Sequence, residues 1–186
     1  MLLEEFDSEL AVTEPKAVYF SYVNQELVCD SLIYSFNGEV IERLRADSLV
    51  GEGGYLSSIN GRHPWYLYEK EGVRVAVMLA PVGAALAVAL LEELRVIGFK
   101  RFVVFASCGV LDSRLAADQI LLPASALRDE GTSYHYAPAS EEIAYEEVSL
   151  LAMEQVLLPL GLRLLVPRLG RRMLFTGKHQ ARQNAE

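Results

Sequence analysis

The sequence predicts an α/β protein in which helices cover both faces of a mixed, mostly parallel central sheet. Three neighbouring segments predict this fold. Residues 73–79 are apolar and rich in valine, as in a buried parallel strand. Residues 84–97 are rich in alanine and leucine, with leucines at helical spacing, and residues 101–106 form a second apolar run. Because two parallel strands need a crossover, this order predicts a right-handed strand–helix–strand unit.

Glycine and proline mark the limits of the elements in this unit. Pro81 and Gly83 separate the first strand from the helix, and Gly98 stands where a helix is expected to end. Ligands of open α/β sheets bind at the carboxyl ends of the strands. We therefore expect the functional edge at Ala80–Gly83 and Ser107–Gly109.

The other segments predict shorter elements. Lys70-Glu71-Gly72 lies between two strand-like runs and predicts a hairpin, whereas the glycine-rich Gly51–Gly54 predicts a flexible turn. That glycine-rich segment lacks the Lys-Ser/Thr of a phosphate-binding P-loop. The expected short strands or buried segments cover residues 17–20, 31–36, 65–69 and 119–123, and the expected short helices cover residues 40–44 and 146–158.

Composition narrows the class of protein. A chain of 186 residues is long enough for one domain with a substantial core. Its net charge of −8 argues against general nucleic-acid binding. A hydrophobic content of 52% is slightly high for a monomer, so a homo-oligomer is expected.

A membrane-spanning helix is the alternative interpretation of the long uncharged run at residues 75–91. Pro81 and Gly83 interrupt that run, and charged residues continue its helical pattern, so a strand followed by a helix explains it better. The acidic N-terminus lacks the features of a signal peptide, which favours a cytoplasmic location. The two cysteines, Cys29 and Cys108, are then expected to be free thiols, and no zinc-binding spacing is present.

Several blocks of the sequence resemble the nucleoside phosphorylase superfamily, which includes uridine and hexameric purine nucleoside phosphorylases. Two of them are FASCGVL at 105–111 and ADQILLPASALRDEGTSYHYAPAS at 117–140, and within the second the run RDEGTSYHY is quite specific. Further blocks are EFDSELAVTEP at 5–15, HPWYLYEKEG at 63–72 and APVGAALAVALLEEL at 80–94. The resemblance implies a phosphorylase-like domain over residues 1–166, followed by a divergent basic tail at 167–186.

The resemblance also implies a reaction. In that family a nucleoside and phosphate give a free base and pentose 1-phosphate, without a metal or organic cofactor. Ser107 matches the position that contacts phosphate, and Gly83 lies in the neighbouring loop at the phosphate and ribose end. Cys108 and Gly109 match positions that line the nucleoside pocket, and Arg128 and His135 lie in a loop expected to face the nucleoside.

Each of these residues also has a structural interpretation. Ser107 could cap a turn, and Cys108 is a small residue better suited to a pocket wall than to nucleophilic attack. Arg128, Asp129 and His135 could serve only to hydrogen-bond their own loop. The sequence leaves these alternatives open.

The chain departs from the family pattern at several places. Val104 stands where many members have a phosphate-gripping arginine, and the N-terminal Gly-Asp-Pro phosphate loop of many members is absent. The resemblance fades after Val166, no Glu-Met-Glu segment occurs, and the C-terminal part of the family fold is expected to be incomplete. Three hypotheses remain: an inactive homologue, an enzyme completed by another chain, or a nucleoside- or anion-binding regulatory module.

Overall fold

A computed structural model describes residues 23–46, 50–110, 119–166, 168–169 and 173–174. These residues divide into two compact units, an N-terminal unit that ends at Ser107 and a C-terminal unit that begins at Cys108. The two units are described separately below.

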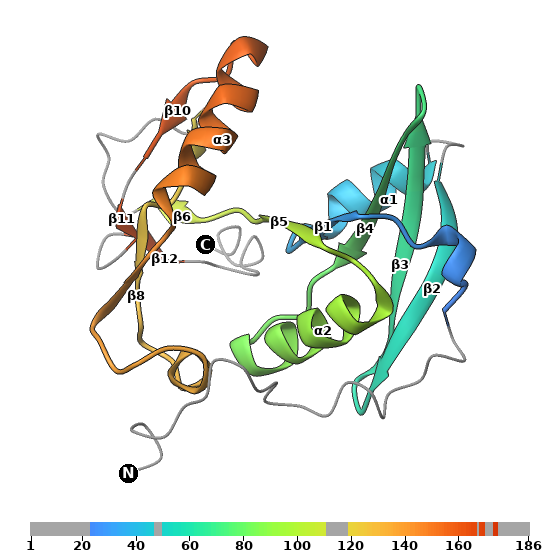
Figure 1. The fold of residues 1–186 in the computed structure, drawn as a ribbon, viewed down its shortest axis with the longest axis horizontal. Helices are drawn as coiled ribbons and strands as arrows, with labels where there is room; N and C mark the ends of the chain where they lie inside the picture. Colours follow the sequence, from blue (N-terminus) through green and yellow to red (C-terminus); the bar gives the residue numbers. More distant parts are fainter. Residues whose placement is uncertain (1–22, 47–49, 111–118, 167, 170–172, 175–186) are drawn as a thin grey trace, which may run out of the picture. The chain divides into compact units, whose positions relative to one another are not determined.

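The N-terminal unit is built on a five-stranded sheet with the order β2-β3-β4-β1-β5 (Figure 1). Its strands are β1 (Ser31–Ser35), β2 (Val50–Ser58), β3 (Gly61–Lys70), β4 (Val73–Leu79) and β5 (Arg101–Phe105). Strand β1 lies between β4 and β5 and is parallel to both, whereas β2, β3 and β4 form an antiparallel meander. The sheet is mixed, as predicted, and β4 and β5 belong to the same sheet.

Helices cover both faces of this sheet. They are α1 (Gly38–Ala46) and α2 (Ala84–Ile97), and a short 3-10 helix, η3 (Gln25–Leu27), precedes them. Helix α2 buries Leu90 and Leu94 in the same cluster as Trp65 of β3. Helix α1 places the Arg45 guanidinium 5.2 Å from the ring centre of Tyr66, the next residue of β3. Since successive side chains of a strand point to opposite faces, α1 and α2 lie on opposite sides of the sheet.

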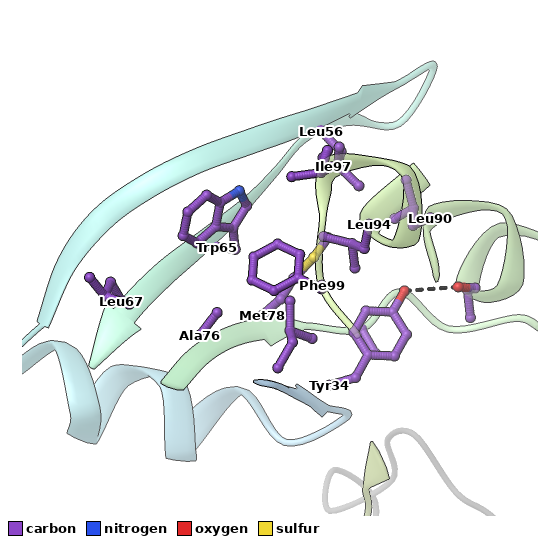
Figure 2. Close-up of a cluster of buried hydrophobic side chains, with 13 residues drawn as sticks. Tyr34, Leu56, Trp65, Leu67, Ala76, Met78, Leu90, Leu94, Ile97 and Phe99 are labelled. Carbon is purple, nitrogen blue, oxygen red and sulfur yellow. Dashed lines mark hydrogen bonds between the residues drawn. The ribbon is translucent and has the colours of Figure 1, made fainter. Parts of the chain in front are cut away.

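The core of the unit lies between α2 and the sheet. Trp65 and Phe99 meet edge to face, with ring centres 5.3 Å apart (Figure 2). The hydroxyl of Tyr34 donates a hydrogen bond of 3.1 Å to the carbonyl of Ala87 in α2. Burial raises the pKa of this phenol, which favours its protonated, hydrogen-bond-donating form. The bond fixes the first turns of α2 against β1.

The turn expected at Gly51–Gly54 is wrong, because these residues lie within β2. The pairing of β2 with β3 shifts between Glu52 and Gly54, which is a β-bulge. A Cβ atom on Gly53 would lie 1.9 Å from Cζ3 of Trp65, so only glycine allows the indole to approach the strand. The glycine run therefore makes room for a core side chain and does not reverse the chain.

The hairpin expected at Lys70-Glu71-Gly72 is confirmed. Strands β3 and β4 are antiparallel and are joined by Glu71 and Gly72, with φ angles of 52° and 79°. Two successive residues with positive φ are typical of the type I′ turn that matches the twist of paired strands.

The long uncharged run does not form one helix. It is divided between the end of β4 and the first half of α2. No helix in the described parts of the chain is long and apolar enough to cross a membrane.

The C-terminal unit consists of short elements (Figure 1). They are β6 (Gly109–Val110), β7 (Ile120–Leu121), β8 (Ser125–Leu127), η4 (Thr132–His135), β9 (Glu142–Ala144), α3 (Glu147–Leu157), η5 (Leu158–Leu160), β10 (Leu164–Leu165), β11 (Arg168–Leu169) and β12 (Met173–Leu174). They form one three-stranded sheet, β11-β8-β9, and two pairs of strands. The strand expected at 119–123 and the helix expected at 146–158 are present, whereas the segment expected at 17–20 lies outside the described residues.

Candidate functional site

Three loops meet at the carboxyl ends of the parallel strands of the N-terminal unit. Strands β1, β4 and β5 end side by side at Ser35, Leu79 and Phe105. The N–H of Phe36 donates to the carbonyl of Phe105, and the N–H of Ala80 donates to the carbonyl of Ser35, each at 2.8 Å. These two bonds join the three loops, so the edge that carries the predicted residues is held in one shape.

Gly83 opens helix α2 at this edge. It is exposed, its φ of 112° favours glycine, and no side chain caps the helix there. The first N–H groups of a helix lack acceptors within the helix and carry partial positive charge. An exposed, uncapped start to α2 is therefore suited to an anion.

Ser107 follows β5 at the same edge. Its side chain is exposed, and its hydroxyl makes no hydrogen bond to any residue that the structure describes. The structure thus brings Gly83 and Ser107 to loops on either side of the end of β1. A turn-capping role for Ser107 finds no hydrogen-bond partner in the described part of the chain.

The loop after β1 was not singled out by the sequence. Ser35 is fully buried, and its hydroxyl accepts from the N–H of Asn37 at 3.1 Å and lies 3.2 Å from the carbonyl of Asn37. The side chain of Asn37 in turn accepts from the N–H of Glu39 at 2.9 Å. A serine and an asparagine between a strand and a helix are a common capping signal, and this signal could have identified the loop.

Cys108 and Gly109 begin the C-terminal unit. Cys108 is half-buried and has a free thiol, and Gly109 pairs with Leu174 in the two-stranded ladder β6–β12.

Arg128 lies at the end of β8 and is 8% exposed. Its guanidinium donates to two serine hydroxyls and two backbone carbonyls, and it stacks 4.1 Å from the ring centre of Tyr134. The acceptors are Ser133 Oγ at 2.9 Å, Ser140 Oγ at 3.0 Å, the carbonyl of Ala137 at 3.1 Å and the carbonyl of Pro138. Arg128 thus binds the loop that follows it.

Glu130 and His135 lie in the same loop. The Glu130 carboxylate accepts hydrogen bonds from the N–H of Thr132 at 2.7 Å and of Ser133 at 3.1 Å, at the start of η4. Burial alone would raise the pKa of Glu130, but these hydrogen bonds outweigh it and leave the pKa lowered. His135 ends η4 with an exposed side chain.

The donor set does not indicate a metal centre. Within the described ranges, no three His, Cys, Asp or Glu side chains lie close enough together to hold a metal ion. The groups gathered at the sheet edge are instead N–H donors and a hydroxyl, which are ligands for an anion.

Comparison with known proteins identifies the same family as the sequence blocks. The family model described as the phosphorylase superfamily matches residues 32–177. Comparison with the sequences of curated proteins gave no significant match.

Among solved structures, one similar chain is a purine nucleoside phosphorylase from Toxoplasma gondii in complex with immucillin-H. It has a TM-score of 0.65 and 16% identity, covering 77% of this chain and 57% of that one. Another is a uridine phosphorylase from Vibrio fischeri ES114, with a TM-score of 0.62 and 16% identity, covering 76% of this chain and 58% of that one. The chain therefore shares their fold and spans somewhat more than half of their length.

Proposed function

Because the chain belongs to the phosphorylase superfamily, we propose that it is a pentosyltransferase that uses phosphate to cleave a nucleoside. The bond between the anomeric carbon and the base breaks, a phosphate oxygen bonds to that carbon, and the base departs with a proton. The products are a free base and pentose 1-phosphate. One observation carries this proposal: the sheet edge joins the start of α2 at Gly83, which no side chain caps, with the exposed hydroxyl of Ser107, which has no hydrogen-bond partner among the described residues.

In this proposal the N-terminal unit holds phosphate. The N–H groups at the start of α2 and the Ser107 hydroxyl would donate to its oxygens. Positive charge develops on the sugar ring as the base departs, so a fixed anion beside the anomeric carbon stabilises the transition state. The bonds that join the three loops support this role, since fixed groups need no reorganisation during the reaction.

The proposed nucleoside contacts are in the C-terminal unit. Cys108 and Gly109 would form part of a small-residue wall, and the loop that contains Arg128 and His135 would contact the base or sugar. Exposed His135 is able to offer either a donor or an acceptor to a ligand.

A second candidate is a nucleoside- or anion-binding homologue without turnover, and a specific observation favours it. In the loop after β1, the N–H groups of Phe36, Asn37 and Glu39 already donate to other groups of the protein. They are not available to phosphate. In addition, Val104 on β5 offers no charge where many family members have an arginine.

Binding and turnover are tested separately on the full chain. The melting temperature is measured with uridine, inosine, adenosine and phosphate, and release of free base is measured with and without phosphate. A ligand that binds the folded state raises the midpoint as its concentration exceeds Kd. We expect a shift with phosphate and with at least one nucleoside, and release of base only when both are present.

Ser107→Ala tests the anion site, with Ser57→Ala on β2 as the matched control. Losing one hydrogen bond to a charged ligand is expected to weaken phosphate binding about tenfold or more. Nucleoside binding without base release would favour the second candidate. No shift with any ligand at millimolar concentration, or a Ser107→Ala protein that binds phosphate normally, would overturn the proposed site.

A further inference from the structure

We propose that Arg128 is a positioning residue, which fixes the loop of residues 129–140 and presents His135, and that its guanidinium does not contact the ligand. The inference rests on the proposed function only in assuming that this loop contacts a nucleoside.

The guanidinium of Arg128 has little capacity left for a ligand. Of its five N–H groups, four are accounted for by the contacts with Ser133, Ala137, Pro138 and Ser140. The ring of Tyr134 lies against the guanidinium, and the residue is 8% exposed. A guanidinium that recognises a ligand usually offers two parallel N–H groups, and these are already occupied here.

The bonds of Arg128 also close the loop at both ends. Its backbone N–H donates to the carbonyl of Glu141 at 2.9 Å, and its carbonyl accepts from the Tyr134 hydroxyl at 3.3 Å. Ser140 continues this closure, because its hydroxyl donates to the carbonyl of Glu142 in β9 at 2.7 Å. A loop of this length loses considerable entropy when it is ordered, and one buried cation with many acceptors offsets that cost.

The hydrogen bonds that hold the loop also determine which of its side chains remain available to contact a ligand. Glu130 is occupied by capping η4, and Ser133 is occupied by Arg128. His135, at the other end of η4, remains exposed. The position of its imidazole therefore depends on Arg128, although the two side chains have no described contact.

The geometry requires arginine in particular. A planar guanidinium can stack on Tyr134 and donate in several directions within its plane, whereas the ammonium of lysine has three donors at one point. Lysine is therefore expected to recover part of the loop's order, and methionine none of it.

The first test measures loop order in the full chain without ligand. Hydrogen exchange of residues 129–141 and chymotrypsin cleavage after Tyr134 and Tyr136 are followed in Arg128→Lys and Arg128→Met, with Arg95→Met on α2 as the control. We expect about a tenfold or larger rise in loop exchange and cleavage for Arg128→Met, and a smaller rise for Arg128→Lys. Exchange in β1, β4 and β5 is expected to stay unchanged, which separates a local effect from general unfolding.

Chemical rescue provides a second readout. In Arg128→Ala, added guanidinium ion should restore protection of the loop, and an equal concentration of ammonium should not. A loop that stays protected in Arg128→Met, or one that guanidinium fails to restore, would overturn the proposal.

Nucleoside binding distinguishes this proposal from the proposed function. We expect Arg128→Met and His135→Ala both to weaken nucleoside binding, with only the former opening the loop. If the wild type binds no nucleoside, the proposed function fails while the loop measurements still decide the role of Arg128. If Arg128→Met abolishes binding but leaves the loop protected, Arg128 contacts the ligand directly and the positioning role is wrong.

Discussion

The two units are ordered by different forces. In the N-terminal unit, thirteen buried residues form one hydrophobic cluster that includes Trp65, Phe99 and Leu94. In the C-terminal unit, Leu122 is the one buried hydrophobic residue among those described, and the buried cation Arg128 organises a polar network. Large apolar side chains of the second unit remain exposed, namely Leu127, Ile143, Tyr145, Val148, Leu151, Val156, Leu158, Leu160, Leu162 and Val166.

The difference follows from strand length and sheet size. Strands of five to ten residues in one sheet provide two broad faces for α1 and α2. The described strands of the C-terminal unit are two or three residues long and belong to sheets of two or three strands. Sheets of that size rarely form a stable structure without packing against further elements.

The largest expected effect concerns the units in isolation. A fragment of residues 8–107 is expected to unfold cooperatively, because its core is complete within the unit. A fragment of residues 108–186 is expected to show no cooperative transition and to bind a hydrophobic dye. Circular dichroism during heating and dye fluorescence measure the two outcomes. A sharp melting transition in the second fragment would show that the C-terminal unit folds cooperatively by itself.

The next effect compares two leucines in helices. Leu94 of α2 is fully buried, whereas Leu151 of α3 is 50% exposed. Leu94→Ala is expected to lower the free energy of unfolding by about 2–5 kcal/mol, because it leaves a cavity. Leu151→Ala is expected to cost about 1 kcal/mol or less. Denaturant unfolding measures both, and similar losses would show that α3 is buried in the protein in solution.

The smallest effect concerns pH and the Glu130 cap. The pKa of Glu130 is lowered in the folded state. The contribution of this carboxylate to the free energy of unfolding is therefore present above its ordinary pKa of about 4.3, and it is lost as the pH falls through the lowered value. Glu130→Gln is expected to cost about 0.5–1 kcal/mol at neutral pH, as for other caps, and to remove this pH dependence.

Amide NMR shifts of Thr132 and Ser133, followed as the pH is lowered, measure the titration of Glu130. Glu146→Gln is the control, since Glu146 precedes α3 without a capping hydrogen bond from its side chain. Unchanged amide shifts across the acid range would show that the cap does not form in solution.

Local patterns in the sequence predicted the elements that depend on local properties. The limits of α2 follow from Gly83 and Gly98, and the β3–β4 hairpin follows from Glu71 and Gly72. The alternation of strands and helices also predicted the edge that carries Gly83 and Ser107. Such features need only neighbouring residues to be recognised.

Features that depend on distant partners were not predictable in the same way. Gly51–Gly54 has the composition of a turn, and only its pairing with β3 shows that it belongs to a strand. Arg128 is an arginine in a polar loop, which suggests ligand binding, and only the folded loop shows how many acceptors surround its guanidinium. The N–H of Phe36 in the β1 loop is likewise satisfied by the carbonyl of Phe105, which lies far along the chain.

The bulge in β2 also bears on how this sequence can diverge. The indole of Trp65 occupies the space that a side chain at position 53 would need, because any Cβ atom there would overlap the ring. A larger residue at position 53 becomes acceptable only after position 65 has become smaller, a route that passes through an empty space in the core, whereas the reverse order passes through a steric overlap with the indole. The two positions are therefore expected to vary as a pair among descendants of this sequence, with the change at position 65 coming first.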